Sequence, residues 1–208
     1  RYTETAERAD QHHYIKPGTD ALLLLAMVHI LFEDNLVDLG RIQTIVTQLD
    51  ALQDAVHGFT PEVVEDVIGI RAETIRQLTH DFANAESAVI YGRIGVSTQA
   101  YGGICHWLIN CINILTGNLD TSGGAMFTLP AFDLVGVTTL TGQVGNYDRW
   151  RSRVRDLPAF GGELPSSALA EEILTDGEGQ IKAMVTVAGN PVLSTPNGEQ
   201  LDRAFESL

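Results

Sequence analysis

Two long apolar runs dominate the pattern of hydrophobic and polar positions along the chain. Between residues 21 and 32 nearly every side chain is apolar (ALLLLAMVHILF), which predicts a helix that is buried on most of its faces. Thr19 and Asp20 precede this run, as an expected N-cap and as an acid that complements the helix dipole. A second long apolar helix is predicted over residues 99–116, and Gly117 is expected to end it.

Three shorter stretches have the spacing of polar and apolar positions that is typical of surface helices. The first covers residues 39–52. The second begins at Thr60-Pro61-Glu62, where a cap is followed by a proline and an acid, and it is expected to stop near Gly69. The third covers residues 71–83. Residues 118–164 are rich in Gly, Thr and Pro and are expected to form loops and short elements.

Two short apolar segments rich in β-forming residues are predicted to be buried strands: residues 87–91 (SAVIY) and 181–188 (IKAMVTVA). Further helices are expected before and after the second segment, over residues 166–174 and 197–208. Helices that alternate with isolated apolar strands indicate an α/β protein, in which the helices pack on a parallel sheet.

The composition is that of a folded, globular protein. Of the 208 residues, 44% are hydrophobic and 19% are charged, which is enough apolar material for a sizeable core. The formal net charge of −14 disfavours general nucleic-acid binding, because an acidic surface repels phosphate backbones; a single phosphorylated ligand remains compatible with it. The longest apolar run is too short to span a bilayer, and no signal peptide is recognised. The abrupt beginning at Arg1 suggests a piece of a longer protein.

The two cysteines, Cys105 and Cys111, have no ligand spacing for zinc or for an iron–sulfur cluster. They lie six positions apart on one predicted helix and would point to different sides, so a disulfide between them is not expected. We interpret both as small core residues in a reducing compartment. The six histidines match no catalytic pattern and are interpreted as surface or core residues. For the arginines between residues 149 and 155, a solvated or salt-bridged loop is favoured over contact with phosphates.

Three segments carry candidate chemistry, and each has an ordinary structural alternative. In PGTD (residues 17–20) the acid can cap a helix, which the sequence alone favours, or accept hydrogen bonds from paired donors such as those of guanine. Glycines in YGRIGVSTQ (residues 91–99) would let a ligand approach the backbone, but they lack the dinucleotide-binding spacing and are explained as turn glycines. Asn190, in AGNPVLSTPN (residues 188–197), is compatible with a ligand contact and about equally with a turn.

Five blocks of the sequence follow one another along the chain: TETAERAD, IKPGTDALLLLAMVHIL, AVIYGRIGVSTQ, LINCINILTGNLDTSGGAMF and VAGNPVLSTPN. In this order they resemble the dimethyl sulfoxide reductase family of molybdopterin oxidoreductases, which includes formate dehydrogenases and dissimilatory nitrate reductases. The resemblance covers essentially the whole chain and is thinnest between residues 134 and 159. It implies a three-layer α/β/α, Rossmann-like fold, with partial sheets from two adjoining cofactor-binding domains, residues 1–125 and 126–208.

The resemblance also implies a cofactor and the residues that hold it. In the family, a pair of molybdopterin guanine dinucleotides surrounds one molybdenum or tungsten atom. No catalytic residue and no metal ligand is implied in this chain, because the family's metal ligand, iron–sulfur segment and C-terminal domain fall outside the five blocks. The implied cofactor-binding residues are Arg1 and Thr3; Gly18, Thr19 and Asp20 at the guanosine end; Ile94, Gly95 and Gln99 in the glycine loop; and Gly189 and Asn190 at the other dinucleotide.

The implied function is two-electron redox chemistry on a small substrate by the intact enzyme, to which this segment contributes cofactor binding. The implied partners are the remainder of the parent polypeptide, which would carry any iron–sulfur cluster, and a small-molecule substrate, with no nucleic acid and no membrane insertion by this segment. The expected location is the cytoplasm, or the periplasm if the parent is exported. Two alternatives stay open: a non-catalytic α/β module that binds a nucleotide or a partner protein, and a cut fragment that binds nothing.

Overall fold

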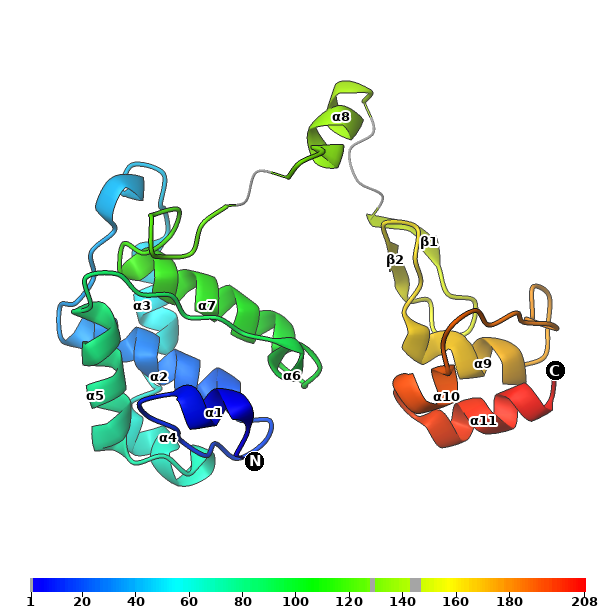
Figure 1. Cartoon of the computed structure of the whole chain (residues 1–208), viewed down its shortest axis with the longest axis horizontal. Helices are drawn as coiled ribbons and strands as arrows, with labels where there is room; N and C mark the ends of the chain where they lie inside the picture. Colours follow the sequence, from blue (N-terminus) through cyan, green and yellow to red (C-terminus); the bar gives the residue numbers. More distant parts are fainter. Residues whose placement is uncertain (1, 128–129, 143–146) are drawn as a thin grey trace. The chain divides into compact units, whose positions relative to one another are not determined.

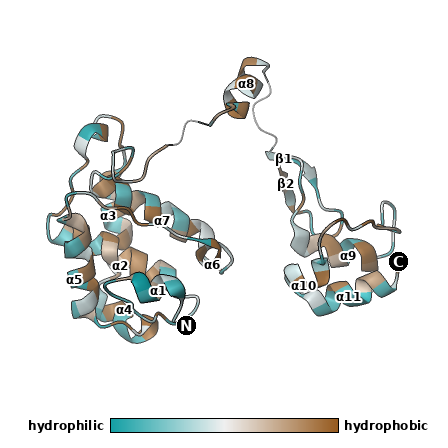
Figure 2. Ribbon diagram, in the orientation of Figure 1, coloured by the Kyte–Doolittle hydropathy of each residue, from teal (hydrophilic) through white to brown (hydrophobic). Residues whose placement is uncertain are grey.

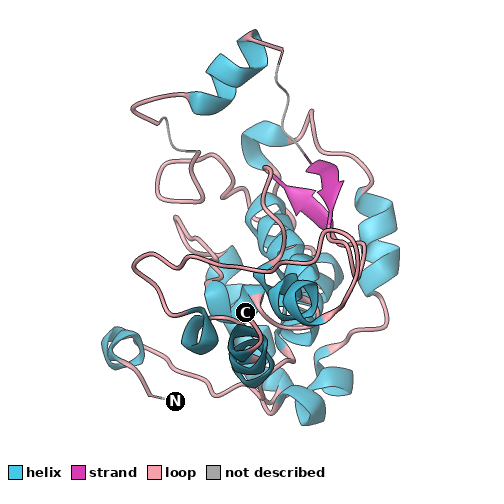
Figure 3. Ribbon diagram, turned by 90° about the vertical axis from the view of Figure 1, so that its right-hand side faces the viewer, coloured by secondary structure: helices cyan, strands magenta, loops and turns pink. Residues whose placement is uncertain are grey.

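The computed structural model describes residues 2–127, 130–142 and 147–208 (Figure 1). The chain divides into two compact units, residues 1–128 and 129–208. Helices supply most of the regular structure, and the described residues contain one small sheet, of two antiparallel strands, in the second unit (Figure 3). The assignment of each unit to a cofactor-binding domain stays a prediction.

The core of the first unit is built around helix α2 (Asp20–Glu33), which confirms the buried helix predicted from the first apolar run. It packs against α3 (Leu49–Val56), α4 (Pro61–Ile68), α5 (Ala72–Ala83) and α7 (Gly102–Leu115). Figure 2 shows that apolar residues recur along α2 and α7, the two longest of these helices. Each large apolar side chain that is fully buried contributes roughly 1.5–3 kcal/mol, so this packing is the main stabilising contribution in the unit. Fully buried members of the core include Ile30, Leu31, Ile68, Ile75, Leu108 and Ile112.

Helix boundaries in this unit follow the sequence closely where glycine or proline marks them. Helix α4 begins at Pro61 and ends at Ile68, and the next residue, Gly69, has a φ of 80°, the left-handed conformation that glycine adopts without strain. The predicted helix over residues 39–52 is wrong in its first half. There the chain forms a 3₁₀ turn, η1 (Gly40–Ile42), and α3 begins only at Leu49, because Gln48 has a φ of 64° and a right-handed helix cannot run through it.

The two predicted strands, residues 87–91 and 181–188, form no sheet in the described parts of the chain. A strand needs a hydrogen-bonded neighbour, and neither segment has another strand beside it there. The first segment is instead bonded through its backbone to two asparagine side chains of the α7 region, Asn113 and Asn118. The sheet predicted from these segments is therefore absent from the described residues, and the observed structure is mixed, with helices and one small sheet.

The second unit has a core of its own, formed by Ala170, Ile173, Leu201 and Ala204. Its sheet pairs β1 (Tyr147–Arg151) with β2 (Pro158–Phe160), in a region where the sequence predicted mostly loops and short elements. The remaining elements are α8 (Leu134–Leu140), η2 (Ser166–Ala168), α9 (Leu169–Leu174), α10 (Pro191–Ser194) and α11 (Gly198–Glu206). None of the helices within the described ranges is long and apolar enough to cross a membrane.

Three of the four arginines between residues 149 and 155, namely Arg151, Arg153 and Arg155, form ion pairs, as the favoured interpretation of a salt-bridged loop predicted. Arg151 binds the carboxylates of Asp148 and Asp156, at 2.6 and 2.9 Å. Arg153 donates to the backbone carbonyl of Thr175 at 2.6 Å, just beyond the end of α9. A cation at that position is favourable, because the last carbonyls of a helix carry partial negative charge.

Candidate functional site

The turn before α2 holds three of the predicted cofactor-binding residues, Gly18, Thr19 and Asp20. Gly18 has a φ of 84°, which turns the chain sharply into the helix. Thr19 occupies the N-cap position, but its hydroxyl donates to the carbonyl of Lys16 at 2.6 Å and makes no capping bond to the helix. Its ψ of 9° departs from the extended conformation of a capping residue, so the predicted cap is wrong in its side-chain contact. The N–H groups of Leu22 and Leu23 donate to the Thr19 carbonyl at 3.0 and 3.4 Å, so only the first amides of α2, those of Asp20 and Ala21, remain available to a ligand.

Lys16 fixes this turn to the far end of α4. Its backbone N–H donates to the carbonyl of Ile68 at 2.9 Å, and its Nζ donates to the carbonyl of Asp66 at 2.7 Å. A lysine is favourable there, because the carbonyls at a helix C-terminus carry partial negative charge. The sequence analysis missed this residue, and the one available signal was a lysine directly before Pro17.

The glycine loop meets the turn through a single side-chain contact. The amide Nε2 of Gln99 donates to Oδ2 of Asp20 at 2.9 Å, and both side chains are half-buried. The two residues are 79 positions apart, so the fold itself brings the two predicted segments together. The glycine loop itself contains the short helix α6 (Ile94–Ser97), on which Ile94 and Gly95 are exposed. The Gln99 amide also approaches the Gly95 carbonyl at 3.4 Å.

The contact lies where the two longest helices of the unit begin. Asp20 is the first residue of α2, and Gln99 lies shortly before the start of α7. At the opposite ends of the two helices, the N–H of Asp38, which follows α2, donates to the carbonyl of Leu115, the last residue of α7, at 2.8 Å. The helices therefore run parallel, with both starts at one end (Figure 1). Burial raises the pKa of the Cys105 thiol in the first turn of α7, and the nearby Asp20 carboxylate raises it further. Two helix N-termini, each with partial positive charge, thus lie beside the Asp20 carboxylate.

A serine–histidine contact fixes α6 against α7. Oγ of Ser97 lies 2.8 Å from Nε2 of His106; Ser97 is exposed and His106 is half-buried. Gly102, the first residue of α7, is required for this approach, because a Cβ there would collide with the Ser97 carbonyl. The sequence analysis gave His106 no role, since its contact with a residue nine positions earlier follows no helical or strand spacing.

Thr3, Gly189 and Asn190 take no part in the hydrogen bond between Asp20 and Gln99. Arg1 falls outside the described residues. The hydroxyl of Thr3 accepts a bond from the Ala6 N–H at 3.3 Å and so caps α1 (Glu4–Arg8). In the second unit, Oδ1 of Asn190 accepts a bond from the Leu193 N–H at 3.3 Å, which caps the short helix α10. The exposed Gly189 and Asn190 border a hollow of about 420 Å³.

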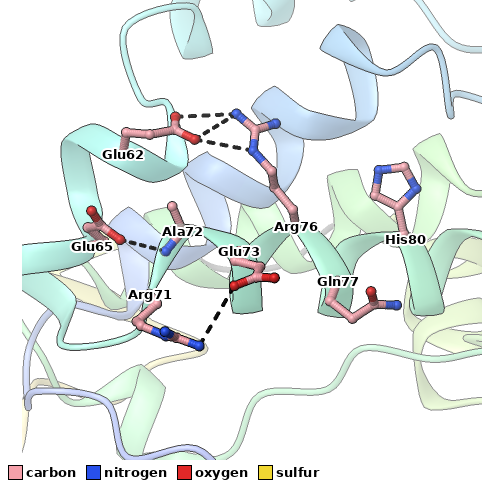
Figure 4. A pocket seen from close by; sticks show the side chains of 8 residues that line it. All are labelled: Glu62, Glu65, Arg71, Ala72, Glu73, Arg76, Gln77 and His80. Atoms are coloured by element: carbon pink, nitrogen blue, oxygen red, sulfur yellow. Dashed lines mark hydrogen bonds and ion pairs between the residues drawn. The ribbon is translucent and has the colours of Figure 1, made fainter.

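A larger hollow, of about 560 Å³, lies over α4 and α5, and its side chains pair mostly with one another (Figure 4). Arg76 donates to Glu62 at 3.0 Å, and a Glu65 carboxylate oxygen accepts the Ala72 N–H at 2.7 Å. It contains none of the predicted cofactor-binding residues. Within residues 2–127, 130–142 and 147–208, no three His, Cys, Asp or Glu side chains are grouped as metal ligands.

A family model described as molybdopterin oxidoreductase matches residues 1–208, the full length of the sequence. The chain belongs to the molybdopterin oxidoreductase family. The match confirms the resemblance seen in the five sequence blocks and disfavours the alternative of a non-catalytic α/β module that binds a nucleotide or a partner protein. Members of this family carry a molybdenum or tungsten pterin cofactor, and the formate dehydrogenases among its relatives are enzymes.

Sequence relatives of this molybdopterin oxidoreductase chain are much longer than the chain itself. It is 39% identical over 120 residues to formate dehydrogenase H of Escherichia coli, a match that covers 57% of this chain and 17% of the relative. It is 26% identical over 215 residues to the alpha subunit of the F420-dependent formate dehydrogenase of Methanocaldococcus jannaschii, covering 100% of this chain and 32% of the relative. The chain thus spans less than a third of the length of either relative.

Among solved structures, acetylene hydratase from Pelobacter acetylenicus has a similar fold. The TM-score is 0.55 at 24% sequence identity, and the superposed part covers 60% of this chain and 17% of that one. At this level of identity the likeness concerns the fold alone.

Proposed function

We propose that this chain is the cofactor-binding segment of a molybdenum or tungsten oxidoreductase that holds a pair of molybdopterin guanine dinucleotides and carries out two-electron chemistry on a small substrate. Family membership supports the enzyme class, and the contact between Asp20 and Gln99 is the observation that supports the site. When bound, the cofactor would supply the redox-active metal. The chain's own residues would bind and orient the nucleotide end.

The residues around Asp20 fit a guanine. Among the bonds between described residues, Oδ2 of Asp20 takes a donor from Gln99, whereas Oδ1 and the Gln99 carbonyl oxygen take none. Guanine presents two neighbouring donors, its ring N1–H and its exocyclic amine, and these match two neighbouring acceptors. The partial positive charge at the starts of α2 and α7 would favour the phosphates of the same ligand.

The remaining predicted residues are assigned to other parts of the two dinucleotides. Arg1 and Thr3 would approach the first from the N-terminal segment, and Gly18, Ile94 and Gly95 would allow the ligand to lie close to the backbone. Gly189 and Asn190, at the hollow of the second unit, would contact the other dinucleotide. Any iron–sulfur cluster, the metal ligand and the substrate pocket would lie in the remainder of the polypeptide, and we expect the assembled enzyme in the cytoplasm.

We further propose that residues 1–125 and 126–208 belong to two adjoining domains of a three-layer α/β/α, Rossmann-like fold. The support is the position of residues 87–91 between two helical segments, directly before the glycine loop. In open α/β sheets, ligands bind beyond the carboxyl ends of strands, which is where that loop lies in the sequence.

The substitution Asp20→Asn in the full-length enzyme tests the site. It replaces an acceptor by a donor that would face the donors of guanine, and losing a charge-assisted hydrogen bond of roughly 1.5–3 kcal/mol weakens binding about 10- to 160-fold. We expect the purified variant to contain less guanine nucleotide and less metal than the wild type.

The matched control for this experiment is Asp54→Asn, which removes the same charge from an exposed position on α3. The control should retain wild-type cofactor content. Equal guanine content in Asp20→Asn and wild-type enzyme would refute the assignment of the site.

A further inference from the structure

The glycine loop, residues 91–99, is held in place by few hydrogen bonds. Its helix, α6, has four residues, and none of them is buried. A helix this short is not stable alone, because too few hydrogen bonds offset the cost of forming the first turn. Between described residues, two side-chain hydrogen bonds connect the loop to the neighbouring helices. One joins Ser97 to His106 on α7, and the other joins Gln99 to Asp20 on α2.

The imidazole of His106 lies against both ends of α6. At the end of the helix, Oγ of Ser97 is 2.8 Å from Nε2 of His106 and 3.4 Å from the Arg93 carbonyl. When His106 is neutral, the hydroxyl donates its single proton to Nε2, the nearer of these two acceptors. Before the helix, a Cβ on Gly92 would lie 3.4 Å from Cε1 of the ring, so the backbone of Gly92 is also close to it. One side chain of α7 thus contacts the loop before and after α6.

The position of His106 is itself well defined by the core. It lies about one turn into α7, next to the buried Cys105, and α7 packs against α2. Ser97 and Gln99 are separated by one residue, so a shift of Ser97 away from α7 would also move the Gln99 amide relative to the Asp20 carboxylate. Contacts at a binding site are accurate when the residues that support them lie on rigid elements. His106 meets this condition for the contact between Gln99 and Asp20.

We propose that His106 is a positioning residue for nucleotide binding, which holds the glycine loop where Gln99 reaches Asp20. His106 acts through Ser97 and does not touch the ligand. The inference deepens the proposed function and rests on it, because this support matters only if the site at Asp20 binds the nucleotide. The loss of one hydrogen bond of ordinary strength should weaken binding about 5-fold.

The rate at which the purified full-length enzyme releases guanine nucleotide tests this role. His106→Phe keeps a ring and removes the acceptor, so release should be about 5-fold faster than in the wild type. Ser97→Ala should have the same effect. The double variant should release the nucleotide no faster than either single variant, because both substitutions remove one shared hydrogen bond. His106→Gln should restore the wild-type rate, because its amide supplies an acceptor for the Ser97 hydroxyl.

The matched control is Thr98→Ala, which removes a hydroxyl from the residue beside Ser97. The Thr98 hydroxyl donates to the Ile94 carbonyl at 3.0 Å, so its bond stays inside the loop and the contact with α7 is kept. Release from this variant should stay within about 2-fold of the wild-type rate. Hydrogen exchange of the Val96 amide, which donates to the Arg93 carbonyl at 2.9 Å, should be faster in His106→Phe than in His106→Gln.

Wild-type release from His106→Phe would overturn the proposal, as would equally fast release from His106→Phe and His106→Gln. Asp20→Asn is measured beside these variants. Faster release from Asp20→Asn together with wild-type release from His106→Phe would refute the positioning role and leave the proposed function intact. An unchanged rate in Asp20→Asn would refute the site, and the positioning role with it.

Discussion

Replacing Asn113 by alanine should destabilise the first unit by an amount that follows from its contacts. The side chain is 1% exposed and makes three hydrogen bonds of 3.1 Å: it accepts the Ile90 N–H and donates to the carbonyls of Ile90 and Ile109. A hydrogen bond contributes roughly 1 kcal/mol net, so three of them amount to about 3 kcal/mol. Because Ile90 is only partly buried and water can reach it, we expect a loss of about 2–3 kcal/mol.

The matched control is Asn110→Ala on the same helix. Asn110 is exposed and its amide donates to the His106 carbonyl at 2.9 Å, so its removal should cost less than about 0.5 kcal/mol. In urea unfolding of the purified protein, the Asn113→Ala midpoint should fall by about 1 M for a slope near 2 kcal/mol per M, and the control midpoint should barely move.

Hydrogen exchange of the Ile90 amide measures the effect of the same substitution at a single residue. Loss of its acceptor should speed this exchange in Asn113→Ala and leave it unchanged in Asn110→Ala. If the two variants had the same urea midpoint and the same Ile90 exchange rate, the argument that the hydrogen bonds of Asn113 to Ile90 stabilise the unit would be refuted.

Two further predictions concern a backbone conformation and a thiol. Gly69→Ala forces a Cβ into the left-handed conformation at the end of α4 and should cost about 1 kcal/mol, seen as a fall in Tm of roughly 2–4 °C; Gly58→Ala, where φ is not positive and the space is open, should change Tm much less. Burial raises the pKa of Cys111 to about 11, so at pH 8 about one thiol in a thousand is ionised, and a disulfide reagent should label it only after unfolding. Fast labelling of the native protein, with Cys105→Ser used to isolate the signal of Cys111, would contradict the burial of this thiol.

Helices were predictable from the sequence where the apolar pattern indicates burial and where a proline or a glycine marks the helix ends. The apolar run of α2 can only be stable inside a protein, and the proline and glycine of α4 mark its two ends directly. The break before α3 was not predictable in this way, because the left-handed Gln48 is neither a glycine nor an asparagine. The prediction of strands over residues 87–91 and 181–188 failed for a different reason, because a strand depends on a hydrogen-bonded neighbour as well as on the segment's own composition.

The candidate site was predictable in its parts and not in its assembly. Asp20 and Gln99 were both singled out from their segments, yet nothing local indicates that two side chains 79 positions apart share a hydrogen bond. Lys16 and His106 were missed because each acts through a distant or irregularly spaced partner. Whether the ten predicted residues bind the cofactor stays a prediction.

The attachment of Lys16 to the end of α4 makes the proposed site depend on a short surface helix. Helix α4 has eight residues; Val64 and Ile68 are buried in the core and Val63 and Val67 are exposed, and such a short helix opens locally at a lower free energy than the whole unit. Opening of α4 would release the Lys16 contacts and with them the turn that carries Asp20, while α2 and α7 stay packed. Mild heating or low denaturant should therefore lower the occupancy of the site before global melting begins, and a bound ligand should in turn protect α4 from proteolysis.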